Sequence, residues 1–431
     1  MSASGRNDNT GSGDEAEEES VDAKIDRLTL EIVELKVSLV EDWVTEASDE
    51  WFRIKTEIKD RDVERLLLIE KKRCDDVVKE YFEENPHVLE AVPECPVCLE
   101  KMWHRSGTTQ YLCCGKRICT KCASQGGSVF NICPYCRGKA PGANETMAVT
   151  KEKSDSGIAW AQAKMGEYYL EGCEGVPKDV DKALSLLNEA AGKGSAKAKE
   201  SLGYYYLGID DCEARQWWEA AAAEGEMFSL CLLGLMTERG QGFDQNEPNP
   251  AEAFRLITIS TTVLHGTKGF NPAAVELSHF FRDNLPVMLH YLRPAVEEGD
   301  ARAGAIDDYA MGLFGVAETY YEQVTVPGHS PIPEALFWHR RVKDPDVDHP
   351  LAKFERVYRE NCAHCKADLP EHNQSSCVEC RAVFYCNRGC QVAHWKAGHK
   401  KDCVKKLKKR LRQRDEERAL KNLGGKNNLL H

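Results

Sequence analysis

Residues 362–403 read CAHCKADLPEHNQSSCVECRAVFYCNRGCQVAHWKAGHKKDC, and this stretch decides how the rest of the chain is interpreted. A Cys-x-x-Cys pair places two thiolates on one tight turn, and the other ligands of a tetrahedral ion come from further along the chain. Eight residues here are candidate ligands, which suits two zinc ions. They are Cys362, Cys365, Cys377, Cys380, Cys386, Cys390, His399 and Cys403.

The closing part of this stretch, from Phe384 onward, resembles the MYND-type zinc finger, and all the ligand positions of that family are occupied. The resemblance implies interleaved sites. The first pair of cysteines joins Cys386 and Cys390, while the second pair joins His399 and Cys403. Disulfides would need an oxidising compartment, and the N-terminal residues show no apolar core of a signal peptide. We therefore expect zinc.

The overall composition limits the kinds of protein that this chain can be. A length of 431 residues suggests about three domains, which we expect to be mainly α-helical. A net charge of −13 argues against nucleic acid as the partner of the whole chain. The longest strongly apolar run, near Met227, is too short to cross a bilayer. We expect an intracellular protein, cytoplasmic or nuclear, that binds other proteins or peptides and no membrane.

A second cysteine cluster occupies residues 93–140 and contains three Cys-x-x-Cys pairs with two adjacent cysteines between the first and second pairs. It resembles the RING-type zinc finger. The resemblance implies a first zinc site made of Cys95, Cys98, Cys119 and Cys122.

The second site of this RING-like cluster departs from the family pattern. The family usually reads Cys-Gly-His where this chain has Cys114, Gly115 and Lys116, and a lysine cation cannot bind a metal ion. Either Cys113 replaces the histidine, or the second site is degraded or empty. With the replacement the chain would bind about four zinc ions. The second site would then consist of Cys113, Cys114, Cys133 and Cys136.

Three further residues of the cluster matter if it acts as a ubiquitin ligase. RING domains of that kind present an apolar groove to a ubiquitin-conjugating enzyme, and their zinc performs no chemistry. The resemblance makes Val97 and Pro134 groove contacts, and Arg137 the side chain that bridges conjugating enzyme and ubiquitin. Each also has an ordinary interpretation, as core residue, turn former and solvated surface residue respectively. No catalytic residue is expected.

The N-terminal part of the chain divides in two. Residues 1–20 are small, polar and acidic, so we expect them to be disordered. In residues 21–90, apolar side chains from Ile25 to Leu39 recur at spacings of three and four, which places them on one stripe of a helix. The stripe packs either against another helix of the same chain or against a second copy in a coiled-coil homodimer.

Residues 155–325 contain a repeat marked by glycine. Gly166, Gly203 and Gly234 each follow a Met or Leu, and small residues at fixed places let two helices approach closely. Each repeat is therefore interpreted as a helix pair that stacks on the next. The first unit, with LEGCEGVPKDVDKALSLLNEAA, resembles the Sel-one-like repeat, a relative of the tetratricopeptide repeat. An ordinary helical bundle with accidental spacing is the alternative.

Two segments complete the chain around the MYND-like module at residues 360–403. Prolines interrupt residues 326–358, which we expect to be a linker or cap. Residues 404–431 are strongly basic and helical in pattern. They are interpreted as a solvated helix that extends the zinc module, with nuclear import or binding to an anionic surface as alternatives.

Two functions follow from this organisation. In the first, the chain is a RING-type ubiquitin ligase whose repeats and MYND-like finger recruit substrates. In the second, it is a non-catalytic adaptor, scaffold or transcription-related co-regulator, because MYND-type fingers typically bind short proline-containing peptides. The sequence shows no glycine-rich cofactor loop after a strand, which argues against a methyltransferase.

Overall fold

A computed structural model describes most of the chain as mainly α-helical. It forms two compact units, residues 1–72 and 73–431, which we describe separately. The predicted acidic tail at residues 1–20 lies almost wholly outside the described residues. The described ranges are 19–40, 49–102, 108–125, 132–138, 145–173, 175–242, 247–264, 272–298, 303–321, 330–342, 349–370 and 375–427.

The first unit is a helical hairpin of α1 (Val21–Val40) and the first part of α2 (Asp49–Glu84). Ile32 of α1 is buried together with Ile54 and Ile58 of α2. The apolar stripe of the first helix therefore packs against a neighbouring helix of the same chain, which is one of the two alternatives that its spacing allows.

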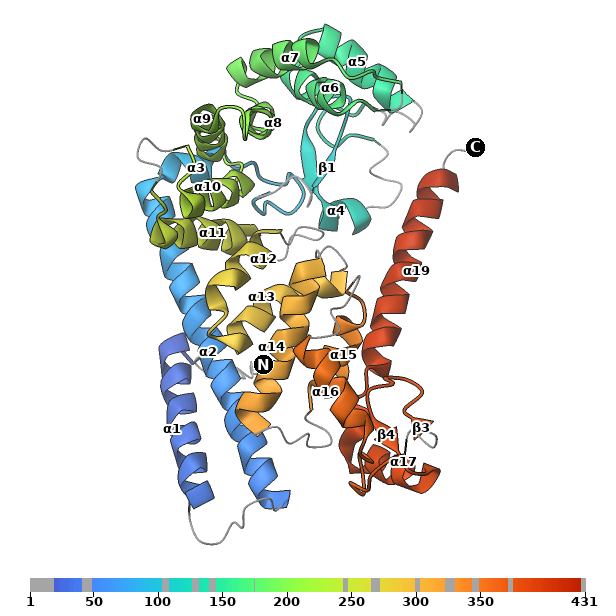
Figure 1. Ribbon diagram of the computed structural model, residues 1–431. Helices are drawn as coiled ribbons and strands as arrows, with labels where there is room; N and C mark the ends of the chain where they lie inside the picture. The colour runs from blue at the N-terminus through green and yellow to red at the C-terminus, as the bar shows by residue number, and fades with distance from the viewer. Residues whose placement is uncertain are drawn as a thin grey trace, which may run out of the picture. The chain divides into compact units, whose positions relative to one another are not determined.

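Helices make up most of the second unit, which begins within α2. Figure 1 shows the helix pairs following one another from green through yellow to orange. The short helix α3 (Pro86–Ala91) comes before them. The helices from green to orange are α5 (Thr146–Asp155), α6 (Ala159–Glu171), α7 (Val180–Gly192), α8 (Ala196–Tyr206), α9 (Asp211–Ala223), α10 (Phe228–Arg239), α11 (Pro250–Leu264), α12 (Pro272–Ser278), the 3-10 turn η4 (His279–Phe281), α13 (Leu285–Glu298) and α14 (Ala303–Tyr321).

The repeat glycines lie where the two helices of a pair cross. A Cβ on Gly166 of α6 would stand 2.6 Å from Cγ of Leu187 on α7. A Cβ on Gly234 of α10 would stand 2.5 Å from Cγ1 of Ile257 on α11. Gly203 of α8 meets α9 in the same way. Because real Cβ atoms do not approach so closely, these positions require glycine, and the predicted repeat corresponds to α6–α7, α8–α9 and α10–α11.

The RING-like cluster is built on a small hairpin that precedes the repeats. Strands β1 (Thr108–Gln110) and β2 (Arg117–Cys119) pair antiparallel, and the short helix α4 (Thr120–Gln125) follows directly. The cluster packs on the repeats through Gly115, whose positive φ of 76° suits glycine and whose missing Cβ makes room for the indole of Trp160.

The C-terminal part of the unit shares one hydrophobic core with the last helices. Buried side chains of α13, α14 and α15 form a single cluster with buried residues of the predicted MYND module and with Leu407 and Leu411 of α19. The module is thus continuous with the repeats. Before the module come α15 (Ile332–His339) and α16 (Pro350–Arg359), and after it comes α19 (Lys405–Asn427). The elements of the module itself are β3 (Ser375–Ser376), β4 (Phe384–Tyr385), α17 (Arg388–His394), the π-turn η6 (Trp395–His399) and α18 (Lys400–Asp402).

Among the helices of the described ranges, none combines the length and the apolar character that crossing a membrane requires.

Candidate zinc sites

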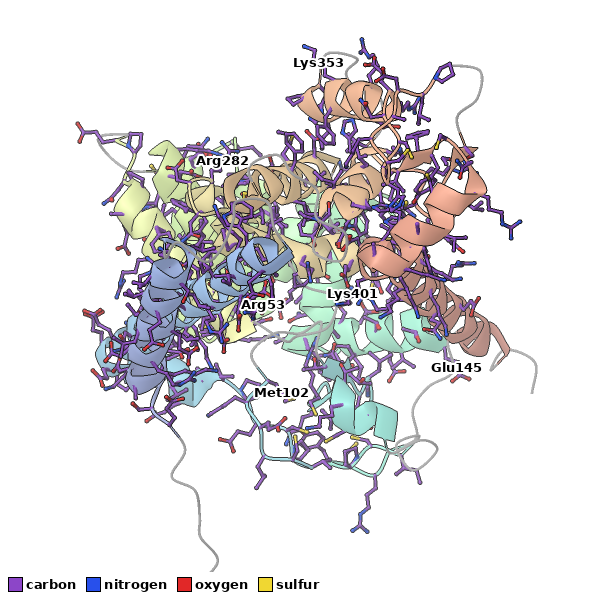
Figure 2. All side chains as sticks on the ribbon, turned by 90° about the horizontal axis from the view of Figure 1, so that it is seen from below. Arg53, Met102, Glu145, Arg282, Lys353 and Lys401 are labelled. Carbon is purple, nitrogen blue, oxygen red and sulfur yellow. The ribbon has the colours of Figure 1, made fainter. Side chains whose placement is uncertain are left out.

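The structure gathers all sixteen predicted ligands into four groups of four, two in each cysteine-rich region. Sulfur atoms of the RING-like cluster lie near the labelled Met102 in Figure 2. The groups are Cys95, Cys98, Cys119 and Cys122; Cys113, Cys114, Cys133 and Cys136; Cys362, Cys365, Cys386 and Cys390; and Cys377, Cys380, His399 and Cys403.

The spacing of the donor atoms fits tetrahedral zinc. Zn–S bonds of about 2.3 Å and Zn–N bonds of about 2.0 to 2.1 Å place two sulfurs about 3.8 Å apart, and a sulfur and a nitrogen about 3.5 Å apart. The Sγ atoms of Cys377 and Cys403 are 3.9 Å apart, and Sγ of Cys380 lies 3.5 Å from Nε2 of His399. None of the nineteen cysteines, all within the described ranges, forms a disulfide.

Four of the Cys-x-x-Cys turns share one backbone device. In each turn, the residue after the second cysteine has a positive φ. Within the described ranges, no other non-glycine residue has this conformation. The conformation reverses the chain so that the carbonyl of the first cysteine accepts a hydrogen bond from the N–H of this residue. A side chain in this region is normally disfavoured, so the turn is held by the surrounding fold. The residues are Leu99, Arg137, Lys366 and Arg381.

The same turns favour the thiolate form of their first cysteine. Burial raises the pKa of Cys95, but the backbone N–H groups of Cys119 and Cys98 outweigh burial and lower the pKa to about 6. Burial is likewise outweighed by backbone N–H groups at Cys362, whose pKa falls to about 6, and at Cys133, whose pKa falls to about 7. Because thiolate is the form that binds metal, these turns are prepared for an ion.

The second RING-like group contains Cys113 in the place of the customary histidine. Sγ of Cys113 lies 3.3 Å from Sγ of Cys136, and the Sγ atoms of Cys114 and Cys133 are 3.5 Å apart. Lys116 is not among the donors, and its ammonium instead lies 5.0 Å from the centre of the Tyr135 ring. The structure therefore supplies four thiol donors at this site.

The second MYND-region group is the most enclosed, since all four of its donors are buried. Burial lowers the pKa of His399, but the thiolates of Cys377 and Cys403 outweigh burial and raise that pKa to about 9. Gly398 directly before it has a φ of 148°, which a side chain would rarely adopt. This glycine turns the chain so that His399 faces the cysteines.

His394 supports this group without being one of its donors. Its ring stacks on His399 with centroids 5.0 Å apart, and its Nδ1 lies 3.0 Å from the hydroxyl of Tyr385. Burial lowers the pKa of His394 to about 4, so the ring is neutral. His364, the other histidine near these cysteines, is exposed and lies outside the groups.

The predicted partner residues of the RING-like cluster lie on its surface. Val97 is 49% exposed, and Pro134 and Arg137 are exposed. Two exposed apolar residues of the same turns were not singled out from the sequence, Leu99 at 71% and Ile132 at 55%. Their positions next to Cys98 and Cys133 are the sequence signal that could have identified them.

Comparison with known proteins identifies one of the two cysteine-rich regions. The family model of the MYND finger matches residues 362–403. These residues form a MYND finger. Over 70 residues the chain is also 33% identical to ubiquitin carboxyl-terminal hydrolase 17 of Arabidopsis thaliana, a match that covers 16% of this chain and 9% of that protein. The chain thus spans less than a tenth of the length of this curated relative.

Two solved structures of repeat proteins are similar in part. The Sel1 repeat protein of Oxalobacter formigenes has 19% identity and a TM-score of 0.35, with 43% of this chain and 80% of that chain covered. Protein c5321, titled a protective antigen of uropathogenic Escherichia coli with an SLR fold, has 18% identity and a TM-score of 0.30, with 53% and 51% covered.

The combination of modules indicates the general role of the chain. Stacked helix pairs present extended surfaces to proteins and peptides, and zinc fingers of this size hold a recognition surface with little core of their own. The chain is therefore a zinc-binding protein whose modules serve protein interaction.

Proposed function

We propose that the chain is a RING-type ubiquitin ligase in which the helical repeats and the MYND finger recruit the substrate. The observation that supports this most is the second RING-like group, in which Cys113 completes a set of four thiols despite Lys116. With all four groups filled by zinc, the sixteen donor residues named above are metal ligands. The zinc is structural and performs no chemistry in this proposal.

The proposed surface for the conjugating enzyme consists of exposed side chains on two metal-binding turns. Val97 and Leu99 belong to the first turn, and Ile132, Pro134 and Arg137 to the other. Because zinc holds this fold together, these exposed apolar side chains are not needed for a hydrophobic core and are available to a partner. Full burial of such a side chain is worth about 1.5 to 3 kcal/mol, and Val97, Leu99 and Ile132, at 49%, 71% and 55% exposed, would contribute part of that in an interface. Arg137 adds donors for the carbonyl groups of a bound partner.

Autoubiquitination of the full chain with a panel of conjugating enzymes tests the proposal. Arg137→Ala should reduce the rate of ubiquitin transfer while the zinc content stays unchanged. Arg381→Ala is the matched control, because Arg381 is also exposed and follows the second cysteine of a turn with a positive φ of 54°, but in the MYND finger. The control should transfer ubiquitin at the wild-type rate.

A wild-type chain that is full of zinc and yet transfers no ubiquitin with any conjugating enzyme would instead support the adaptor. Equal activity of Arg137→Ala and wild type would show that Arg137 does not bridge the conjugating enzyme and ubiquitin.

The adaptor is favoured by one observation at the MYND finger. Val392 of α17 is 46% exposed, and Trp395 lies about one helical turn further on. Trp395 is half-buried against the core, so Val392 and the open part of the Trp395 ring form the apolar face for a short proline-containing peptide, the ligand class that MYND-type fingers typically bind. Val392→Glu should abolish peptide binding in a fluorescence polarisation assay. Val378→Glu is the control, because Val378 of the same finger is 81% exposed but belongs to a metal-binding turn.

Self-association is the remaining part of the proposal. α1 exposes Leu30, Val33 and Val37, at 65%, 53% and 52%, while its other stripe packs against α2. Their spacings of three and four place them on one face of the helix. We assign this face to a second copy of the chain, so that one assembly would contain two RING-like clusters.

A further inference from the structure

Three side chains from separate helical segments converge outside the four cysteine-containing groups. Asp307 lies on α14, His339 ends α15, and His349 directly precedes α16. Nδ1 of His339 lies 3.4 Å from Oδ1 of Asp307, and Nε2 of His349 lies 3.1 Å from Oδ2. The three donor atoms lie within 4.8 Å of one another.

These distances suit ligands around one ion. Bonds of about 2.0 to 2.1 Å to nitrogen and oxygen place two ligands of a tetrahedral zinc ion about 3.3 to 3.4 Å apart. A hydrogen bond between a charged imidazole and a carboxylate is shorter, about 2.7 to 2.9 Å. The pair formed by His339 and Asp307, at 3.4 Å, has the separation of two ligands around one ion, while the pair formed by His349 and Asp307, at 3.1 Å, is within the range of a direct hydrogen bond.

Each imidazole lies beside a different oxygen of the Asp307 carboxylate. The two rings are stacked, with centroids 4.2 Å apart and planes 18° from parallel, so binding one ion in the plane of both rings requires the rings to turn toward it. The side chain of His339 is only 4% exposed and that of His349 14%, whereas that of Asp307 is 32% exposed. The donors thus lie at the edge of the core, where an ion can enter from the side of the carboxylate.

One hydrogen bond constrains how an ion would bind. Nδ1 of His349 accepts a hydrogen bond from the N–H of Leu351 at the start of α16, so the proton of the neutral ring is on Nε2. An ion on Nε2 requires the proton on Nδ1 instead. Ion binding therefore exchanges the Leu351 contact for a metal bond, and the ion should be held less tightly than in the cysteine groups.

We infer that Asp307, His339 and His349 form a further metal site, which takes zinc or a similar divalent transition-metal ion. Two imidazoles and a carboxylate are a donor set that zinc accepts, and a water molecule completes the tetrahedron. The ion links α14, α15 and α16. Arg340, the next residue after His339, hydrogen-bonds to the carbonyl of Cys380 at 3.0 Å and so connects this junction to the finger.

The test measures metal per chain in the full-length protein after equilibration with zinc alone. Asp307→Asn keeps the volume of the side chain but removes its charge, and should lower the zinc content by one ion per chain. His349→Gln should do the same, while its amide oxygen can still accept the hydrogen bond from Leu351. His279→Gln is the matched control, because His279 lies 3.6 Å from Glu276 and 3.8 Å from Asp308 outside any group of donors.

Cobalt substitution gives a second measurement that does not depend on a variant. Wild-type protein loaded with cobalt should show an absorption component without thiolate-to-cobalt charge transfer, and mild chelation should remove this component first. Its absence would overturn the proposal. Equal zinc content in wild type, Asp307→Asn, His349→Gln and the control would also overturn it, and would identify the three residues as a hydrogen-bonded cluster without metal.

Discussion

Replacing Gly203 by alanine tests the close helix crossing on which the repeat depends. Gly203 lies on α8, and an added Cβ would stand 2.5 Å from Cδ1 of Trp218 on α9. Trp218 is 1% exposed and donates a hydrogen bond of 3.2 Å from its Nε1 to the carbonyl of Glu200. The indole therefore has to move, or the two helices have to separate.

The expected magnitude follows from opposing contributions. Alanine favours the helix over glycine by about 0.5 to 1 kcal/mol. Overpacking a closed core costs about 1 to 3 kcal/mol, and loss of the indole hydrogen bond costs about 1 kcal/mol more. The steric and hydrogen-bond losses exceed the gain in helix propensity. We expect Gly203→Ala to destabilise the α8–α9 pair by about 1 to 3 kcal/mol.

Hydrogen–deuterium exchange of the full chain provides the local measurement. Amides of α8 and α9 should lose about 5- to 150-fold in protection, since about 1.4 kcal/mol corresponds to a factor of ten. Gly192→Ala is the matched control. Gly192 is the last residue of α7, and no atom lies within 4 Å of an added Cβ, so protection should stay the same or rise slightly.

The reasoning would be refuted by a Gly203→Ala protein whose α8 and α9 amides are protected as well as those of the wild type. Equal loss of protection in Gly192→Ala would also contradict it, because the effect would then come from glycine replacement in general and not from the contact with Trp218.

Three further predictions concern the fingers and the first unit. Complete chelation of zinc should unfold both cysteine-rich regions and loosen α13–α15, which share the core of the MYND finger, while α6–α11 keep their circular dichroism signal. Arg340→Ala should speed the release of zinc from the MYND finger, because Arg340 binds two of its carbonyl groups. Arg359→Ala should have a smaller effect, because Arg359 pairs with the same Glu355 and lies over the Phe384 ring but binds no carbonyl group of a metal-binding turn. Leu30→Glu should shift the protein from dimer to monomer in sedimentation analysis, and an unchanged mass would refute the dimer.

Much of the metal-site geometry could be predicted because the signal is local. Two cysteines three residues apart must lie on one turn, and the pairing between turns followed from the family resemblance. At the second RING-like site the sequence left open whether Cys113 replaces the histidine, since adjacent cysteines cannot be ranked by spacing. The structure brings Cys113 within 3.3 Å of Cys136. The repeat glycines were also predictable, because a close helix crossing excludes any larger residue.

The segment around α15, where Asp307, His339 and His349 come together, could not be predicted in the same way. Prolines in residues 326–358 indicate an interruption of helical structure, but proline is tolerated in the first turn of a helix. Pro331 is the N-cap of α15, Pro333 lies in its first turn, and all the side chains from Ile332 to His339 except that of Glu334 are buried. Asp307 and His349 are 42 residues apart and on different elements, so no spacing connects them.

The core shared by the MYND finger and the last repeat helices affects how genetic experiments should be read. A truncated protein that lacks residues 362–403 would expose the apolar sides of α13–α15 to water, and quality-control proteases remove such chains. Loss of function in cells that carry this truncation would then reflect low abundance of the protein, and would say little about a missing partner. Single substitutions at exposed positions of the finger, such as Val392, separate recognition from folding.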